Sequence, residues 1–202
     1  MATAVAPVGL RERKKRRTQD AIVDAAMHLF STKDYNAVSV EEIAAAADVS
    51  PRTFYRYFPA KEDVLLGHSE VDDAIREVLA RRRADESDVD FIARAMLGAI
   101  HVLNTEHISL VYELIQTVPA LQARLFQQIW RGGQEEFIDA LLVGRRRTAD
   151  NELRARVITH AVGDAIRLGA VSWLQAGQRG SLARECNKAL AHLRQAFGPA
   201  GE

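Results

Sequence analysis

The stretch SVEEIAAAADVSPRTFYRYFPAK, residues 39–61, decides the fold of this chain. Ser39 and Glu42 form a capping-box pattern, in which each side chain binds a free backbone N–H group in the first turn of a helix. An alanine-rich segment continues that helix, and Ser50 followed by Pro51 predicts the start of another. The stretch therefore predicts two short helices joined by a tight turn, which is a helix-turn-helix.

The second of these helices is crowded with side chains that can hydrogen-bond or stack. Phe54 and Phe58 are four residues apart on one face, which is typical of core positions. The remaining positions carry Arg52, Thr53, Tyr55, Arg56 and Tyr57. So many polar and aromatic groups on a two-turn helix indicate that a polar partner lies against it.

The composition is that of an ordinary soluble globular protein, with 202 residues, 48% hydrophobic and 27% charged. This length allows one domain or two small ones. Cys186 is the only cysteine, so no internal disulfide is possible and a reducing compartment is expected. We find no signal peptide and no membrane span, and we predict a cytoplasmic protein with no membrane partner.

Charge is distributed unevenly along a chain whose net charge is zero. Residues 1–17 hold six basic residues against one acid, and RERKKRR occupies residues 11–17. We expect a disordered basic arm. It could be a solvated tail, but beside a helix-turn-helix we favour an arm that contacts DNA phosphates or a minor groove, with Arg16 and Arg17 as contacts.

Helical periodicity continues to the end of the chain and predicts an all-α fold of about nine helices. Thr18 is the expected cap of the first helix, and residues 18–66 form a three-helix DNA-binding domain. Residues 67–202 form a helical bundle for effector binding and dimerisation. The helices expected after the helix-turn-helix are 61–83, 91–104, 107–117, 119–147, 151–176 and 181–197.

The run from Arg17 to Leu66, including AMHLFSTKDYNAVSVEEIAAAADVSPRTFYRYFPAKEDVL, resembles the DNA-binding domain of the TetR family of one-component transcriptional regulators. This resemblance implies a homodimer that binds an operator in double-stranded DNA and holds a small-molecule effector in its C-terminal domain. Contacts to bases and phosphates are implied for Ser39, Arg52, Thr53, Tyr55, Tyr57 and Lys61. Arg52 could read guanine through a bidentate pair, and the two tyrosines are better suited to phosphate or sugar.

Lys61 has independent support as a phosphate contact. It lies in the first turn of the helix expected after Pro59, where the helix dipole disfavours a cation by about 0.3–1 kcal/mol. A bound phosphate would convert that cost into a joint site with the helix N–H groups. The alternative is that Lys61 points into solvent.

The long helix expected over residues 151–176 is apolar on more than one side. Ile158, Val162, Ala165, Gly169 and Ser172 form one stripe, and its small residues permit close helix contact. In the family that this chain resembles, the last two helices form the dimer interface. The alternative is a fully internal helix in a monomer.

An effector pocket is expected among the first helices of the C-terminal domain, because ligand sites are mainly apolar with few polar groups. Its candidate walls are His101, Tyr112, Phe126, Trp130, Phe137 and Trp173, and the first two could be polar anchors. Ordinary core packing is the alternative for each. The segment that begins YELIQTVPALQARLF resembles the C-terminal domain of the mycofactocin-system regulator, which implies an apolar or acyl-type effector.

Enzyme functions find little support in the sequence. There is no Gly-rich phosphate loop, Walker pattern or zinc-ligand spacing, so no cofactor, metal or catalytic residue is predicted. We expect a repressor that is released from its operator by a small ligand. The alternatives are an enzyme or ligand-storage protein with a vestigial helix-turn-helix, and a helical adaptor.

Overall fold

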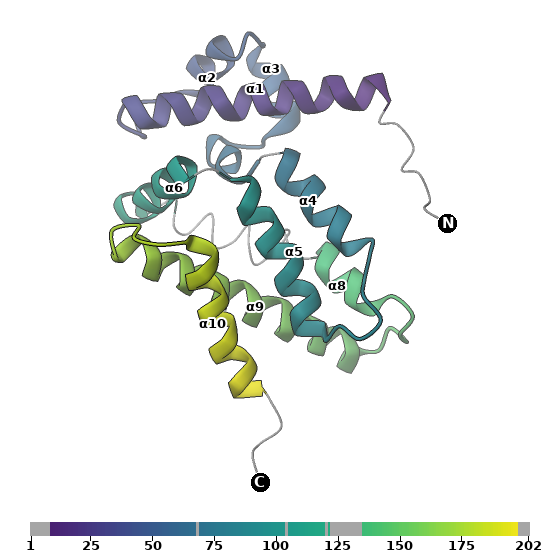
Figure 1. Cartoon of the computed structure of the whole chain (residues 1–202). Helices are drawn as coiled ribbons and strands as arrows, with labels where there is room; N and C mark the ends of the chain where they lie inside the picture. Colours follow the sequence, from purple (N-terminus) through teal and green to yellow (C-terminus); the bar gives the residue numbers. More distant parts are fainter. Residues whose placement is uncertain (1–8, 68, 104, 120, 122–134, 198–202) are drawn as a thin grey trace. The chain divides into compact units, whose positions relative to one another are not determined.

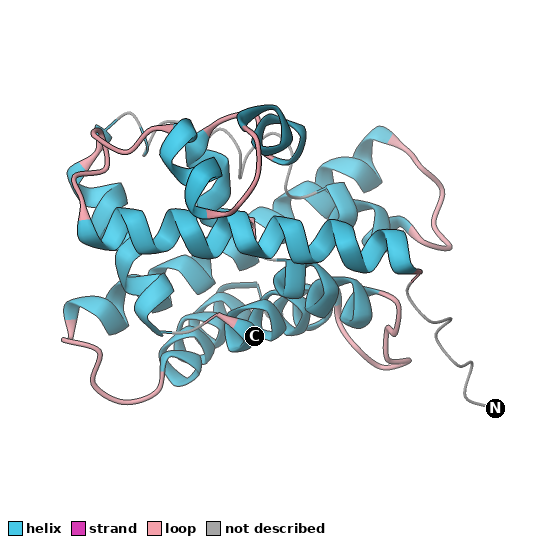
Figure 2. Ribbon diagram, turned by 90° about the horizontal axis from the view of Figure 1, so that it is seen from above, coloured by secondary structure: helices cyan, strands magenta, loops and turns pink. Residues whose placement is uncertain are grey.

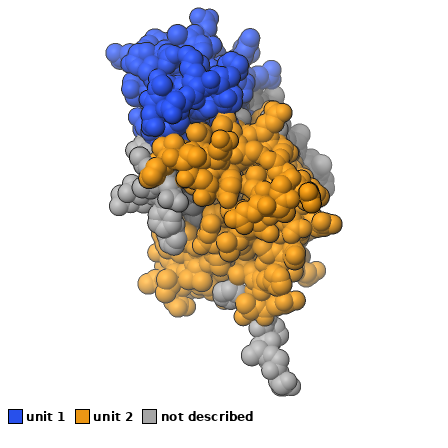
Figure 3. Space-filling view, turned by 90° about the vertical axis from the view of Figure 1, so that its left-hand side faces the viewer, with its two compact units in different colours: residues 1–69 blue, residues 70–202 orange. Residues whose placement is uncertain are grey.

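The computed structural model describes residues 9–67, 69–103, 105–119, 121 and 135–197. In these residues the regular structure is entirely helical, with nine α-helices and one 3-10 helix (Figures 1 and 2). The chain divides into two compact units, residues 1–69 and 70–202 (Figure 3). The all-α fold class is thereby confirmed. None of the described helices has an apolar stretch long enough to cross a bilayer.

Unit 1 is built around a long first helix. Its elements are α1 (Leu10–Thr32), α2 (Val40–Ala46), α3 (Pro51–Tyr57) and the 3-10 helix η1 (Lys61–Leu66). Helices of seven residues are not stable alone in water, so α2 depends on packing against α1 and α3 on packing against α2. The shared core contains Ile22, Val23, Ala26, Phe30, Val38, Ile43, Ala44, Phe54, Phe58, Val64 and Leu65, all buried.

The start of α1 corrects the expectation of a disordered arm up to residue 17. The helix begins at Leu10, and the basic residues form its first two turns. Thr18 does not cap a helix here, because its hydroxyl donates to the Lys14 carbonyl at 3.0 Å inside α1. Arginine and lysine are good helix formers, and the Glu12–Arg16 pair at 3.6 Å spans one turn.

The tight turn between α2 and α3 follows the predicted caps. Ser39 makes the complete capping box with Glu42, and the Ser50 hydroxyl accepts from the Thr53 N–H at 3.1 Å. Between them Asp48 has φ = 54°, and Val49 N–H donates to the Ala44 carbonyl at 2.9 Å. This is a Schellman ending with aspartate in the left-handed position that glycine usually occupies.

The expected helix over residues 61–83 is broken in the structure. It consists of η1, a break at Gly67, and α4 (Ser69–Leu79). A Cβ atom at Gly67 would lie 2.4 Å from the Phe58 ring, so the chain passes too close for any other residue. Asp20 of α1 holds the start of α4 by accepting from the Ser69 hydroxyl at 2.7 Å. Asp20 and Ser69 are 49 residues apart in sequence.

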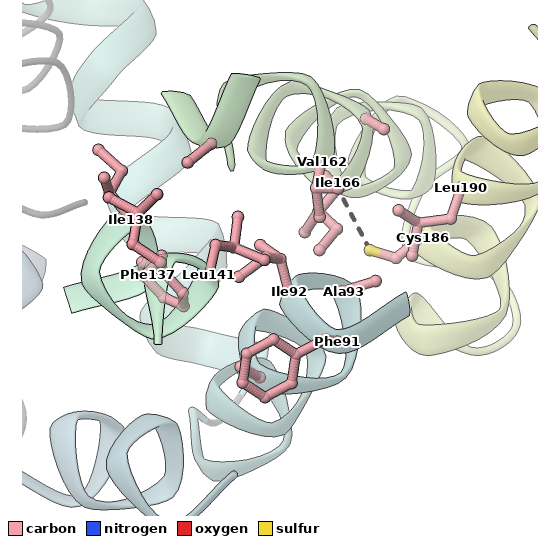
Figure 4. Close-up of a cluster of buried hydrophobic side chains, with 14 residues drawn as sticks. Phe91, Ile92, Ala93, Phe137, Ile138, Leu141, Val162, Ile166, Cys186 and Leu190 are labelled. Carbon is pink, nitrogen blue, oxygen red and sulfur yellow. Dashed lines mark hydrogen bonds between the residues drawn. The ribbon is translucent and has the colours of Figure 1, made fainter. Parts of the chain in front are cut away.

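Unit 2 is a helical bundle. Its elements after α4 are α5 (Asp88–Val102), α6 (Thr105–Thr117), α8 (Glu135–Leu142), α9 (Ala149–Gln175) and α10 (Leu182–Phe197). The helix expected over 119–147 is described only as α8, which ends at Leu142 before Gly144 with φ = 75°. Figure 4 shows Phe91 and Ile92 of α5, Leu141 of α8 and Val162 of α9 packed in one core.

The inner face of α9 is apolar and packs against its own chain, while Leu153, Val157 and Leu168 are exposed on the opposite side, where Asp164 also lies. At Gly169 a Cβ atom would lie 2.6 Å from Cys186 Cα, so α9 and α10 cross in close contact there. The Cys186 thiol lies 3.5 Å from the Ile166 carbonyl across this crossing (Figure 4). The glycine in the predicted small-residue stripe therefore admits α10 of the same chain.

Candidate functional site

The helix α3 presents its polar side chains outward because Phe54 and the C-cap residue Phe58 are buried in the core. Phe54 is fully buried, and the ring of Tyr55 stands edge-on to it with centroids 5.6 Å apart. Arg52 is exposed, and Tyr55 is 53% exposed. An exposed arginine and tyrosine on one short helix can reach the edges and phosphates of a nucleic acid.

Ser39 and Thr53 are engaged in local hydrogen bonds at the helix starts. The Ser39 oxygen accepts from the Glu42 N–H at 3.1 Å. The Thr53 hydroxyl lies 3.0 Å from the Ser50 hydroxyl. Their DNA contacts stay predictions, which would use the second bonding capacity of each hydroxyl.

Lys61 is directed into its own domain. Its ammonium donates to the carbonyls of Tyr35 at 2.7 Å and Val38 at 2.9 Å, and it lies 4.4 Å from the Tyr35 ring centroid. These contacts tie η1 to the connection between α1 and α2. The helix start at Lys61 is capped by Asp63, whose carboxylate accepts from the Ala60 N–H at 2.9 Å. The sequence analysis considered only a phosphate contact or a solvent-exposed side chain for Lys61, and it missed these internal hydrogen bonds. A contact to phosphate stays a prediction and would use the third N–H group of the Lys61 ammonium.

The basic turns of α1 lie beside the end of α3. A groove is lined by Gly9, Arg11, Glu12, Lys14, Lys15, Thr18, Arg56 and Tyr57. Tyr57 is half-buried, with the Arg56 guanidinium 5.3 Å from its ring centroid. Of the two predicted arm contacts, Arg16 is half-buried beside Glu12 and Arg17 is exposed. The basic groove residues on α1 belong to the run 11–17 that the sequence predicted to contact DNA, but they lie in a helix and not in a disordered arm.

The six predicted pocket residues are not brought together by the described structure. Phe126 and Trp130 lie outside the described residues. Phe137 belongs to the core cluster of unit 2, and Trp173 is buried with its indole N–H donating to the Gly180 carbonyl at 3.1 Å. Tyr112 is half-buried on α6.

His101 is not an inward-facing anchor. Its side chain is exposed at the end of an open groove along α5, which Asn187 and Arg194 of α10 also line. Its Nδ1 lies 2.7 Å from the Leu97 carbonyl one turn earlier. The periodicity of α5 did not distinguish this outer position from the inner face.

Thr159 is a buried polar residue that the sequence reasoning missed. It lies on the inner face of α9 with no exposed surface, and its hydroxyl finds no hydrogen-bond partner among the described residues. Burial and the neighbouring Glu185 raise the pKa of the Cys186 thiol to about 11, and the described residues contain no cluster of three or more potential metal ligands.

Comparison with known proteins identifies the domain. Residues 22–67 match the tetR family of bacterial regulatory proteins, so the basic turns of α1 lie outside the match. The transcriptional regulator TcmR of Streptomyces glaucescens is 35% identical over 130 residues, which are 59% of this chain and 57% of TcmR. The chain therefore matches little more than half the length of this relative.

Solved structures share the fold over most of the chain. FadR of Thermus thermophilus, a TetR-family repressor in complex with lauroyl-CoA, aligns with a TM-score of 0.50 at 24% identity, covering 91% of this chain and 99% of FadR. FadR of Bacillus subtilis in complex with stearoyl-CoA aligns with a TM-score of 0.52 at 19% identity, covering 85% and 95%. At these identities the likeness concerns the fold alone. Residues 22–67 are thus a helix-turn-helix domain of the type found in the tetR family of bacterial regulatory proteins.

Proposed function

We propose that this protein is a one-component transcriptional repressor in the cytoplasm, with no catalytic activity. It binds a near-palindromic operator as a homodimer and is released by a small apolar or acyl-type ligand. The observation that carries the proposal is the division of α3, where Phe54 is buried while Arg52 and Tyr55 face outward. A recognition helix needs this arrangement to enter a major groove.

Arg52 is the residue best suited to read sequence. A guanidinium can bind O6 and N7 of guanine together, and such a pair discriminates against other bases by about 1–3 kcal/mol. Tyr55 is suited to phosphate or sugar contacts, which orient α3 without reading bases. In a dimer, two such helices would reach successive major grooves about 34–36 Å apart.

Footprinting on the DNA that flanks the protein's own gene tests this function. We expect salt-dependent protection of one near-palindromic site, which weakens when lauroyl-CoA or stearoyl-CoA is added. An effector acts in this way when it binds one conformation of the regulator better than the other. The absence of specific protection would favour a ligand-storage or adaptor function.

We predict that Arg52→Ala lowers operator affinity by about 5- to 150-fold and relaxes base preference at one position in each half-site. The physical reason is the loss of the bidentate contact to a base edge. Fluorescence anisotropy with the operator and with single-base variants measures both effects. Arg76→Ala, which removes the same charge from α4 in unit 2, is the control and should bind like the wild type.

The outer face of α9 supports a homodimer. Leu153, Val157 and Leu168 are 61%, 47% and 56% exposed, and helical spacing places them on the side opposite the buried Val162 and Ile166. A second copy would cover this outer face through the same residues, as the two-fold symmetry of a dimer requires. Apolar side chains aligned along a helix are typical of such an interface.

We predict that Leu168→Glu dissociates the dimer, because it places a charge on this exposed face of α9. Light scattering after size-exclusion chromatography measures the mass. Val143→Glu is the matched control, since Val143 is 80% exposed after α8 and lies outside α9. A Leu168→Glu protein that keeps the mass of the wild type contradicts the assignment of this face.

A further inference from the structure

Three arginines surround a single carboxylate at one end of unit 2. Arg145 donates two hydrogen bonds to Asp88, at 2.7 and 2.8 Å. Arg82 donates to the same carboxylate at 2.5 Å, and a nitrogen of Arg154 lies 3.4 Å from it. The arginines come from the α4–α5 connection, the α8–α9 connection and α9, which meet at this end (Figure 1). Three positive charges against one negative charge leave a surplus of two at this point.

The nearest acid along the chain does not neutralise this surplus. The carboxylate of Glu86 is engaged by Arg94, which donates to both of its oxygens at 2.7 Å. Such a pair matches one arginine to one acid, as does the pair of Arg156 and Glu135 in the same unit. The three arginines at Asp88 depart from this balance, so an anion from solvent would find uncompensated charge there.

The Asp88 carboxylate has no capacity for further donors, whereas the arginines have donors left. Each oxygen of Asp88 accepts two hydrogen bonds, which fills the about four lone-pair sites of a carboxylate. A guanidinium carries several N–H donors, and only one or two of each arginine are used on Asp88. All three arginines reach the surface, so their remaining donors are accessible to a ligand.

A fourth arginine adjoins the other three. Arg146 directly follows Arg145, and its backbone is held in place because its carbonyl accepts from the Asn151 side-chain amide at 2.7 Å and from the Thr148 N–H at 3.0 Å. Its side chain is exposed and makes no hydrogen bond or ion pair with the residues that the structure describes. The positive charge of Arg146 therefore adds to the surplus.

We propose that this arginine cluster, Arg82, Arg145, Arg146 and Arg154, binds a phosphate group, either free or carried by a small molecule. A phosphate monoester has a charge of about −1.5 to −2 at pH 7, which matches the surplus, and its oxygens can accept from several guanidinium groups at once. The bound phosphate would join two connections and α9, so it stabilises unit 2. The cluster lies in unit 2 and needs no operator, so the proposal is independent of DNA binding.

The test compares two double variants of the full-length protein with equal loss of charge. Arg146→Gln with Arg154→Gln removes two guanidinium groups from the cluster but keeps the two arginines that hold Asp88 most closely. Arg179→Gln with Arg184→Gln, the control, removes two exposed arginines near the α9–α10 connection. Pyrophosphate is titrated at constant ionic strength, and thermal unfolding is followed by tryptophan fluorescence, because both tryptophans belong to unit 2.

We expect pyrophosphate to raise the unfolding midpoint of the wild type and of the control variant in a saturable way. The cluster variant should bind about 10-fold or more weakly, because it loses charged hydrogen bonds to the ligand, and its midpoint should not rise over the same range. A wild-type midpoint that does not move, or equal behaviour of the two double variants, would overturn the proposal.

Coenzyme A without an acyl chain, as a second probe, distinguishes the two sources of phosphate. Tighter binding of coenzyme A than of pyrophosphate, lost in the cluster variant, would support the site and identify a phosphate carried by an organic molecule. Tighter binding of pyrophosphate, lost in the same variant, would support the site and identify free phosphate as its ligand. Neither result bears on operator binding, which footprinting tests separately.

Discussion

Asp88→Asn is expected to lower the free energy of unfolding of unit 2 by about 3 kcal/mol, because it strands several arginines around a neutral side chain. Asp88 is buried and accepts two hydrogen bonds from Arg145, at 2.7 and 2.8 Å. Arg82 donates to the same carboxylate at 2.5 Å, and Arg154 lies 3.4 Å away. The arginines are partly exposed, which places the loss at the lower end of the range for buried ion pairs.

This carboxylate joins parts of unit 2 that are far apart in sequence. Asp88 is the first residue of α5, Arg82 precedes it in the α4–α5 connection, and Arg145 lies in the connection between α8 and α9. Urea unfolding followed by tryptophan fluorescence measures the effect, since both tryptophans belong to unit 2. Asp139→Asn is the control, because Asp139 pairs with Arg147 at the surface, where ion pairs contribute little. Equal midpoints for the two variants would contradict the role of Asp88.

The Asp88 effect should also depend on pH. Burial raises the pKa of Asp88, but the hydrogen bonds from Arg145 and Arg82 outweigh it and hold the pKa below the ordinary value of 3.8. A lowered native pKa means that the ionised carboxylate stabilises the fold at pH values above the unfolded pKa. The difference between wild type and Asp88→Asn should therefore be full at pH 7 and shrink as the pH falls below about 4. A constant difference down to pH 3 would be the contrary result.

The helix-turn-helix could be predicted from sequence because its signals are local. The cap at Ser39, the cap at Ser50 and the spacing of Phe54 and Phe58 all act within four residues, and the structure contains each of them. The same locality explains why the number and class of helices were predicted well. Hydrophobic periodicity and caps are read within one or two turns of chain.

The errors arose where distant residues decide the local structure. The break at Gly67 depends on the Phe58 ring and on Asp20 of α1, and neither is visible in the periodicity of residues 61–83. The first helix was predicted to begin at Thr18 because the basic run 11–17 was expected to be a disordered arm. The high helical propensity of arginine and lysine and the Glu12–Arg16 ion pair favour a helix over these residues.

The sequence predicted which side chains of α3 face outward, but it did not predict the contacts that other candidate residues make. Outward positions such as Arg52 and Tyr55 follow directly from which neighbours are buried. His101 could not be placed, because an apolar helix such as α5 offers no sequence signal that separates a pocket from an outer groove. The small-residue stripe of α9 was read correctly as a close helix contact, but the partner at Gly169 is α10 of the same chain.

Lys61→Met is expected to lower the free energy of unfolding of unit 1 by about 3 kcal/mol, because it removes two charged hydrogen bonds. The ammonium binds the carbonyls of Tyr35 and Val38, two residues that are 5% and 1% exposed, and it also contacts the Tyr35 ring. Methionine fills similar space but leaves both carbonyls without this donor. Since the tryptophans lie in unit 2, far-UV circular dichroism should show an earlier unfolding phase while the tryptophan signal keeps its midpoint.

Lys33→Met is the matched control for this change. Lys33 pairs with Glu42 at 2.8 Å, but the two side chains are 50% and 41% exposed, so the pair is screened by solvent and little change is expected. The comparison also separates the two roles of Lys61. If Lys61 only contacted phosphate, the Lys61→Met variant would lose operator affinity and keep its stability. If Lys61 links η1 to the α1–α2 connection, the variant loses stability even in the absence of DNA. An unchanged unfolding curve for Lys61→Met would contradict the stabilising role, because water would then replace the two hydrogen bonds to the carbonyls without loss. Phosphate contact would remain as the role of Lys61.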